Sequence, residues 1–190
     1  MSRIQSRDVT VREFCREDYQ DFYDYFVNSP PLFLNSIGMK AFTPERTKQF
    51  DDQWLKRLDA REAGGSPIPV MTVFYRGERI GFHTTTHHEP GKSLMLHAHF
   101  FRADLRGVGI GIVSGTLATE RFLTEYGYKE VLFHVPKRNL APIRVMEKSG
   151  LECLGETVFD SPVLIEPMPA LIYRATIDNL PAAKKAAGLE

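Results

Sequence analysis

The chain has 190 residues, of which 43% are hydrophobic and 25% charged, an ordinary composition for a globular protein with a substantial core. Lys plus Arg and Asp plus Glu are both 24, so no charge excess indicates nucleic acid or a membrane surface as the principal partner. Cys15 and Cys153 are too few and too far apart for a disulfide framework, and no signal peptide or membrane-length apolar span is present. We expect one cytoplasmic domain over residues 1–180, with 181–190 as a loosely ordered tail.

The first part of the chain alternates between predicted strand and helix. Residues 9–14 alternate as an opening strand, and residues 16–26 carry aromatic side chains at helical spacing. Prolines and a glycine interrupt regular structure in residues 29–42. Threonine, proline and glutamate at 43–45 then predict the start of a helix that extends to about Ala63.

Three strands are predicted next. Residues 70–75 and 80–87 are joined by a hairpin-type turn at 76–79. A second turn at 89–92, which contains proline and glycine, leads into a third strand at 93–101. These strands follow one another as an antiparallel series.

A glycine-rich loop, Arg-Gly-Val-Gly-Ile-Gly at residues 106–111, follows the third strand, and an amphipathic helix comes directly after it. Glycine lets the main chain turn tightly and approach a ligand closely. The first N–H groups of a helix are unpaired, and the helix dipole favours an anion there. The loop therefore predicts a bound pyrophosphate, with Arg106 adding a cation. The same glycines would also suit a tight turn without a ligand.

Two familiar phosphate-binding motifs do not match this loop. The dinucleotide motif needs Gly-x-Gly-x-x-Gly, and the third glycine has the wrong spacing. The Walker motif needs Gly-Lys-Ser/Thr, but Gly111 is followed by Ile112 and Val113. The remaining pattern is Arg-x-x-Gly-x-Gly.

A second signature begins at Asn139 and ends at Leu151. Asn139 suits a helix N-cap, and Gly150 suits the left-handed position that ends a helix. Between the two signatures, residues 130–135 are typical of a buried strand. This order of loop, helix, strand and capped helix resembles the GNAT superfamily of acyl-CoA-dependent N-acetyltransferases, and is closest in pattern to its ribosomal-protein alanine acetyltransferase branch.

The resemblance implies an α/β (α+β) fold with a mixed, mostly antiparallel central sheet and helices on both faces. It also implies that the sheet splays where the strand before the loop and the strand after the next helix diverge, which admits the pantetheine arm. Acetyl-CoA is then the co-substrate, and no metal is implied. The residues assigned to acetyl-CoA binding are Phe101, Arg106, Gly107, Val108, Gly109, Ile110, Gly111 and Asn139.

The activity implied by the resemblance is transfer of an acetyl group to a primary amine by direct attack on the thioester. The acceptor is a small-molecule amine or a protein N-terminus, with neither nucleic acid nor a membrane as partner, and a homodimer is a possible assembly. The alternative is a non-catalytic acyl-CoA-binding module of the same fold, acting as a sensor or in protein interactions after losing its proton-transfer groups.

Two candidate catalytic residues, His97 and His99, lie on the strand before the loop. They project to one face of that strand, and histidine is the side chain whose charge changes near neutral pH. Some arylalkylamine N-acetyltransferases place histidines here, so His97 is our first candidate for the general base and His99 the second. A hydrogen-bonded structural role is the alternative for each. Met95 lies about where the family often has a glutamate and cannot act as a base.

A zinc site is a second interpretation of these histidines, because several of them fall on adjoining predicted strands. No cysteine lies nearby, the spacing matches no metal signature, and strand alternation divides the side chains between two faces. We therefore expect no metal. The histidines concerned are His83, His87, His88, His97 and His99.

The general acid is not assigned by the sequence. Met146 lies where many family members have a tyrosine that protonates the departing thiolate, and methionine cannot donate a proton. Tyr126, Tyr128 and Tyr173 are substitutes, although each also suits a structural role.

The acceptor is also open. In the family, the region 29–42 helps to line the acceptor pocket, and its apolar side chains here suit an apolar amine or a simply packed loop. An apparent insertion at 156–169 carries acidic residues that would attract a cationic amine or belong to a solvated loop.

Overall fold

The computed structural model describes residues 4–105, 107–161 and 163–189. Contacts along the chain divide it into two compact units. The first unit comprises Met1–Arg12, Val70–Phe159 and Pro169–Glu190, and the second comprises Glu13–Pro69 and Asp160–Met168.

The first unit is built on a seven-stranded sheet with the order β1-β2-β3-β4-β5-β7-β6. The β4–β5 pair is parallel, whereas the β2–β3, β3–β4 and β5–β7 pairs are antiparallel. This confirms the mixed, mostly antiparallel sheet expected from the sequence. The strands are β1 (Val9–Glu13), β2 (Met71–Tyr75), β3 (Glu78–Glu89), β4 (Ser93–Phe100), β5 (Glu130–Pro136), β6 (Glu152–Phe159) and β7 (Met168–Thr176).

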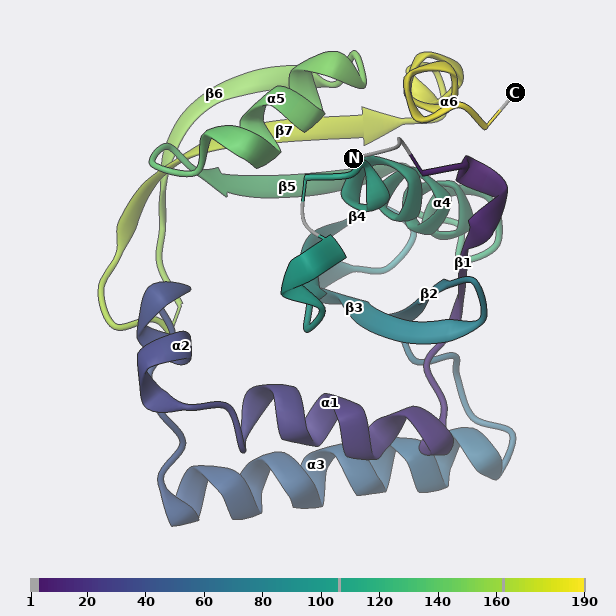
Figure 1. Ribbon diagram of the computed structural model, residues 1–190. Coiled ribbons are helices and arrows are strands. Elements are labelled where there is room, and N and C mark those ends of the chain that lie inside the picture. The colour runs from purple at the N-terminus through teal and green to yellow at the C-terminus, as the bar shows by residue number, and fades with distance from the viewer. Residues whose placement is uncertain (1–3, 106, 162, 190) are drawn as a thin grey trace. The chain divides into compact units, whose positions relative to one another are not determined.

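Three helices cover one face of this sheet, as Figure 1 shows: α4 (Ile110–Thr124), α5 (Leu140–Lys148) and α6 (Leu180–Ala187). Leu94 and Leu96 of β4 pack with Phe133 of β5 and Phe122 of α4 in one apolar core. Side chains alternate along a strand, so the odd-numbered residues Met95, His97 and His99 of β4 face away from α4.

The parallel pair β4–β5 separates along its length. Its ladder covers Ser93↔Glu130, Leu94↔Val131 and Met95↔Leu132 and ends there. Beyond that point β4 continues beside β3 as far as Phe100, and β5 continues beside β7 as far as Pro136. The two strands therefore diverge where the sequence analysis expects the pantetheine arm to enter.

Helix α6 corrects the expectation of a loose C-terminal tail. Leu180, Ala183 and Ala187 are buried, and this spacing places one apolar stripe of a helix against the protein. Gly188 ends the helix in a left-handed conformation, with φ at 69°. The alanine-rich composition suggested a tail because alanine contributes little hydrophobic signal, although it packs closely once a partner helix is present.

Leu180 is expected to contribute strongly to stability. It lines a narrow cavity of about 30 Å³ together with residues of α4 and α5, so Leu180→Ala would enlarge an existing void. We expect a loss of about 2–4 kcal/mol in unfolding free energy, measured by urea denaturation. Lys185→Ala, at an exposed position of the same helix, should change stability by less than about 0.5 kcal/mol. Equal effects of the two substitutions would contradict this packing role.

The second unit is helical and rich in aromatic side chains. Phe22 of α1 packs against Phe14, Phe50 and Trp54, with ring centroids 4.6–5.7 Å apart. Thr43 caps α3 as predicted, because its hydroxyl accepts a hydrogen bond from the N–H of Arg46 at 3.3 Å. The helices are α1 (Tyr19–Phe26), α2 (Pro31–Ser36) and α3 (Pro44–Glu62).

Two predicted irregular segments contain regular structure. Residues 31–36 form α2, whose first residue is a proline, so proline here starts a helix instead of interrupting one. The insertion expected at 156–169 begins inside β6. Short 3₁₀ turns complete the fold at η1 (Ser6–Asp8), η2 (Arg16–Asp18) and η3 (Ala103–Leu105).

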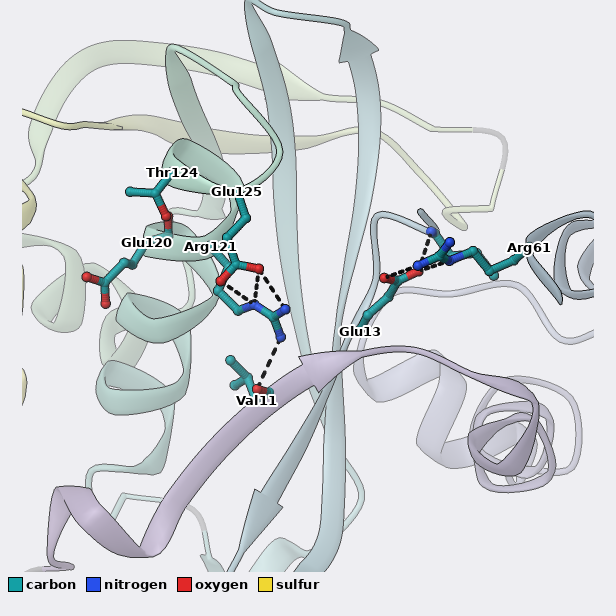
Figure 2. A network of polar contacts seen from close by, with 8 residues as sticks. Val11, Glu13, Arg61, Glu120, Arg121, Thr124 and Glu125 are labelled. Atoms are coloured by element: carbon teal, nitrogen blue, oxygen red, sulfur yellow. Dashed lines mark hydrogen bonds and ion pairs between the residues drawn. The ribbon is translucent and has the colours of Figure 1, made fainter. Parts of the chain in front are cut away.

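Arginine side chains hold main-chain segments together in each unit (Figure 2). In the second unit, Arg61 forms a two-bonded ion pair with Glu13, at 2.7 and 3.1 Å. In the first unit, Arg121 pairs with Glu125 at 2.7 Å and donates to the carbonyl oxygen of Val11 at 3.4 Å. Within the described part of the chain, no helix has both the length and the apolar character needed to cross a membrane.

Candidate active site

The loop before α4 has the conformation that its glycines predict. Gly107 and Gly109 have φ angles of 76° and 107°, which residues with a side chain rarely adopt. Gly109 is the N-cap of α4, a helix of 15 residues. Main-chain N–H groups of the first turn therefore start directly after a left-handed glycine, which fits a pyrophosphate. Arg106, the expected cation, lies outside the described residues.

The remaining loop residues hold the start of α4 in place through apolar contacts. Ile110 is buried, with 2% of its surface exposed, and joins an apolar cluster that also contains Val108 and Phe100. Gly111 lies close to Phe100, since a Cβ at Gly111 would come within 3.9 Å of that ring. The end of β4 and the start of α4 thus pack against each other through apolar side chains.

The main-chain polar groups of Phe100 and Phe101 at the end of β4 point toward opposite edges of the strand. The N–H of Phe101 donates to the carbonyl oxygen of Ile80 at 3.2 Å, so it points toward β3. Main-chain polar groups alternate between the two edges of a strand, and those of Phe100 therefore point toward β5. This is the side on which the two strands diverge.

Asn139 stands at the N-cap position of α5 but does not cap the helix. Its own N–H donates to Pro136 at 2.8 Å, and among the described residues its side chain makes no capping hydrogen bond. Asn139 thus occupies the N-cap position that the sequence predicts, but the side-chain hydrogen bond typical of that position is not formed within the described part of the chain. The carboxamide is exposed at the start of α5.

His97 and His99 lie on the same face of β4, as alternation predicts, and each contacts a threonine of β3. His97 Nε2 is 2.8 Å from the Thr86 hydroxyl, and His99 Nε2 is 3.0 Å from the Thr84 hydroxyl. Both threonines are on the neighbouring strand, each diagonally across the β3–β4 ladder from its histidine. Each threonine hydroxyl contacts the Nε2 atom of its histidine. For His97, the other ring nitrogen, Nδ1, is left for another partner.

The surrounding protein keeps both histidines neutral. Desolvation, followed by the charges of His134 and His87, lowers the pKa of His97 to about 4. Desolvation, followed by His97 and His83, lowers the pKa of His99 to about 3. At physiological pH each imidazole therefore has a lone pair that can accept a proton.

Two aromatic residues beside His97 were not assigned to the site from the sequence. The Phe159 ring of β6 stacks on His97 with centroids 5.8 Å apart, and it meets His134 of β5 edge-on at 5.6 Å. Burial lowers the pKa of His134 as well. Alternation in β5, where Val131, Phe133 and Val135 are buried and His134 lies between them, was the signal that could have placed His134 on the histidine face.

His83 belongs to the opposite face of the sheet. Its Nε2 is 2.9 Å from the Ser114 hydroxyl of α4, and the side chain is 1% exposed. Strand alternation thus separates His83 from His97 and His99. Among residues 4–105, 107–161 and 163–189, no three or more His, Cys, Asp or Glu side chains come together in a way that would hold a metal ion.

Burial of His83 predicts acid sensitivity. Desolvation lowers its folded-state pKa from 6.5 to about 4, so the unfolded chain binds more protons between these values, and stability falls as pH falls below about 6.5. For one such group, the loss between pH 7.5 and pH 5 is about 2 kcal/mol. His83→Gln, whose amide can still reach Ser114, should show a smaller loss in denaturation at the two pH values. An unchanged pH dependence would contradict this assignment.

The candidate general acids lie in or beside the apolar core of the first unit. Met146 and the three tyrosines all pack in or against the apolar cluster beneath α4 and α5. Tyr173 is 2% exposed. Tyr126 and Tyr128 lie just before Glu130, the residue of β5 where the ladder with β4 begins. These positions support the structural interpretation of the tyrosines.

The segment 29–42 is partly a packed core, as its simpler interpretation predicts. Leu34 and Met39 are buried, with 1% and 9% exposed. Met39 forms a bridge to Leu164, and the N–H of Lys40 donates to Val163 at 2.9 Å. Leu34 and Met39 therefore stabilise the second unit rather than present an apolar surface to an acceptor.

Solved structures share this fold over nearly the whole chain, although their sequence identity is low. They include spermidine N-acetyltransferase from Vibrio cholerae in complex with CoA and spermine (TM-score 0.70, 12% identity, 92% of this chain and 98% of that one). Ribosomal-protein-S5-alanine acetyltransferase from Vibrio fischeri gives a TM-score of 0.67 at 11% identity, covering 94% and 98%. An acetyltransferase from Salmonella typhimurium with its cofactor acetyl-CoA gives 0.64 at 14%, covering 90% and 95%. No curated protein matches the sequence.

A sheet whose parallel pair β4–β5 diverges beside a glycine-capped helix is the fold that the resemblance implies. The chain belongs to the GNAT acetyltransferase family, because the family model described as the acetyltransferase (GNAT) domain matches residues 8–152. This confirms the resemblance drawn from the two signatures. The reaction class is thus acetyl-CoA-dependent N-acetyl transfer.

Proposed function

We propose that the protein acetylates a primary amine by direct attack on the thioester of acetyl-CoA, with His97 as the general base. The single observation that carries this assignment is the position of His97 just beyond Met95, where the β4–β5 ladder ends. A neutral imidazole there lies at the opening of the strands and on the face away from α4. We further propose that residues 1–180, together with the packed helix α6, act as one catalytic domain.

The donor is held by main-chain groups. The N–H groups of the first turn of α4, after Gly109, bind the pyrophosphate. Main-chain groups of Phe100 pair with the pantetheine arm in the manner of an added strand, and the exposed Asn139 carboxamide contacts the same arm. Acetyl-CoA supplies the activated acetyl group. With acetyl-CoA bound in this way, the amine approaches from the face of β4 that carries His97 and His99.

Proton transfer balances without a dedicated acid. The ammonium form of the acceptor gives one proton to His97, and its nitrogen then attacks the carbonyl carbon. The C–S bond breaks, and the thiolate takes a second proton from the same nitrogen. The products are the amide, CoA thiol and one proton that must leave His97. This scheme accommodates a methionine at position 146.

The acceptor class is either a small amine or a protein N-terminus. Two of the structural neighbours act on a polyamine and on a ribosomal-protein alanine, by their names, and these provide the first compounds to test. The assay measures CoA release with spermidine, an aminoglycoside, tryptamine and an alanine-initiated peptide. Turnover of any one supports the proposal. If the protein binds acetyl-CoA tightly but acetylates none of these compounds, the non-catalytic module is favoured.

A further inference from the structure

His97 is connected to the protein surface by a chain of side-chain hydrogen bonds. His97 Nε2 is 2.8 Å from the Thr86 hydroxyl, and the same hydroxyl is 3.0 Å from Nδ1 of His87. His97 is partly buried, whereas Thr86 and His87 are exposed. The three side chains thus run from the histidine face of β4 to solvent.

A bulge in β3 places His87 in this chain. The β3–β4 register shifts between Thr86 and Glu89, so that His87 and His88 stand opposite Leu94 alone. His87 also has a φ of 51°, in the left-handed region that residues with a side chain seldom occupy. Such strain is retained where the surrounding structure or the function requires the conformation. Here the bulge carries the His87 imidazole to the hydroxyl that contacts His97.

Two other histidines near this site contact different hydroxyl groups. His99 contacts Thr84, which is only partly exposed. His88 contacts Thr85 at 3.1 Å and the hydroxyl of Tyr128 at 3.3 Å. The Thr86 hydroxyl, in contrast, contacts two imidazoles. That of His97 faces the opening between β4 and β5, and that of His87 faces solvent.

We propose that Thr86 and His87 form a proton exit path for His97, which removes the proton released in each turnover. The inference rests on the proposed function of His97 as base. In the conducting arrangement, His97 Nε2–H donates to the Thr86 oxygen, and the Thr86 O–H donates to His87 Nδ1. The substrate proton arrives on His97 Nδ1, the Nε2 proton passes to Thr86, and the Thr86 proton passes to His87.

The path then returns to its starting state. His87 gives its Nε2 proton to water, and tautomer exchange together with rotation of the Thr86 hydroxyl restores the original hydrogen bonds. No bond other than N–H and O–H bonds is broken, and the one proton taken from the ammonium group reaches solvent. Burial of His97, which disfavours its imidazolium form, drives the proton outward. Thr86 and His87 are thus positioning residues that act through His97.

Two substitutions interrupt the path without removing His97. Thr86→Val keeps the branched shape but lacks the hydroxyl. His87→Gly lacks the imidazole and fits a positive φ. With an acceptor from the panel that the wild type acetylates, we expect each variant to lower kcat about tenfold in dilute buffer, less than loss of a direct general base. KM for acetyl-CoA should not change.

Rescue experiments separate proton transfer from a structural role. Added imidazole should restore kcat of His87→Gly and leave the wild type unaffected, and Thr86→Ser should retain wild-type kcat. His88→Ala, a histidine of the same bulge outside the path, is the control and should keep full activity. Loss of kcat that imidazole does not restore, or equal loss in His88→Ala, would overturn the path. Activity lost in Thr86→Val but kept in His87→Gly would overturn the role of His87.

A measurement without an acceptor tests the path independently of the enzymatic reaction. NMR of protein labelled with ¹⁵N-histidine reports the exchange of the His97 ring proton with solvent. We expect this exchange to slow about tenfold in both variants, and an unchanged rate would overturn the path. If the exchange slows but His97→Ala retains full activity, His97 is not the base and only the proposed function fails.

Discussion

Gly109→Glu is expected to abolish acetyl-CoA binding and leave the protein folded. A side chain at a φ of 107° costs about 1–2 kcal/mol in backbone strain, a small part of the stability typical of a domain. The carboxylate would also stand at the start of α4, where the pyrophosphate needs the unpaired N–H groups. We expect the Kd for acetyl-CoA to rise more than about 100-fold, which corresponds to about 2.7 kcal/mol, by titration calorimetry.

Two variants separate charge from strain in this experiment. Gly109→Gln has the same size and strain without the charge, so it should bind acetyl-CoA more tightly than Gly109→Glu. Gly127 also has a positive φ, 71°, with no atom within 4 Å of its missing Cβ. Gly127→Glu should therefore share the strain and retain binding. Retained binding in Gly109→Glu would place the pyrophosphate elsewhere.

His97→Ala should lower kcat by about 10²- to 10³-fold, within the range of general-base catalysis. KM for acetyl-CoA should stay the same, because in our proposal the α4 loop and main-chain groups hold the donor. Steady-state kinetics with an acceptor from the panel provides the measurement. His99→Ala is the matched variant on the same face of β4, and a larger effect there would reverse our assignment of the base.

The pH profile of kcat gives a second test of His97. Since its pKa is lowered to about 4, the imidazole stays unprotonated as pH falls from 7.5 toward 5.5, and it is lost as a base only when pH approaches 4. We therefore expect no decline in kcat from this group near pH 6.5. A decline centred near 6.5 that disappears in His97→Ala would mean that the bound complex solvates His97 more than the structure indicates.

The conformation of the proposed donor loop could be predicted from the sequence because its signals are local. A glycine pair before a helix specifies the main-chain conformation of that short segment, and the φ angles of Gly107 and Gly109 agree with it. The strand order around the loop was predictable for the same reason. Local composition failed at α6 and at β6, where alanines and a polar strand carry little hydrophobic signal.

The sequence by itself determined the family, the glycine-rich turn into α4 and the common face of His97 and His99. Only the tertiary structure decided what surrounds His97: Thr86 and His87 from β3, His134 from β5 and Phe159 from β6. The physical reason is that strand alternation assigns a face within one strand, whereas contacts across strands depend on register, on the bulge at His87 and on where β4 and β5 separate.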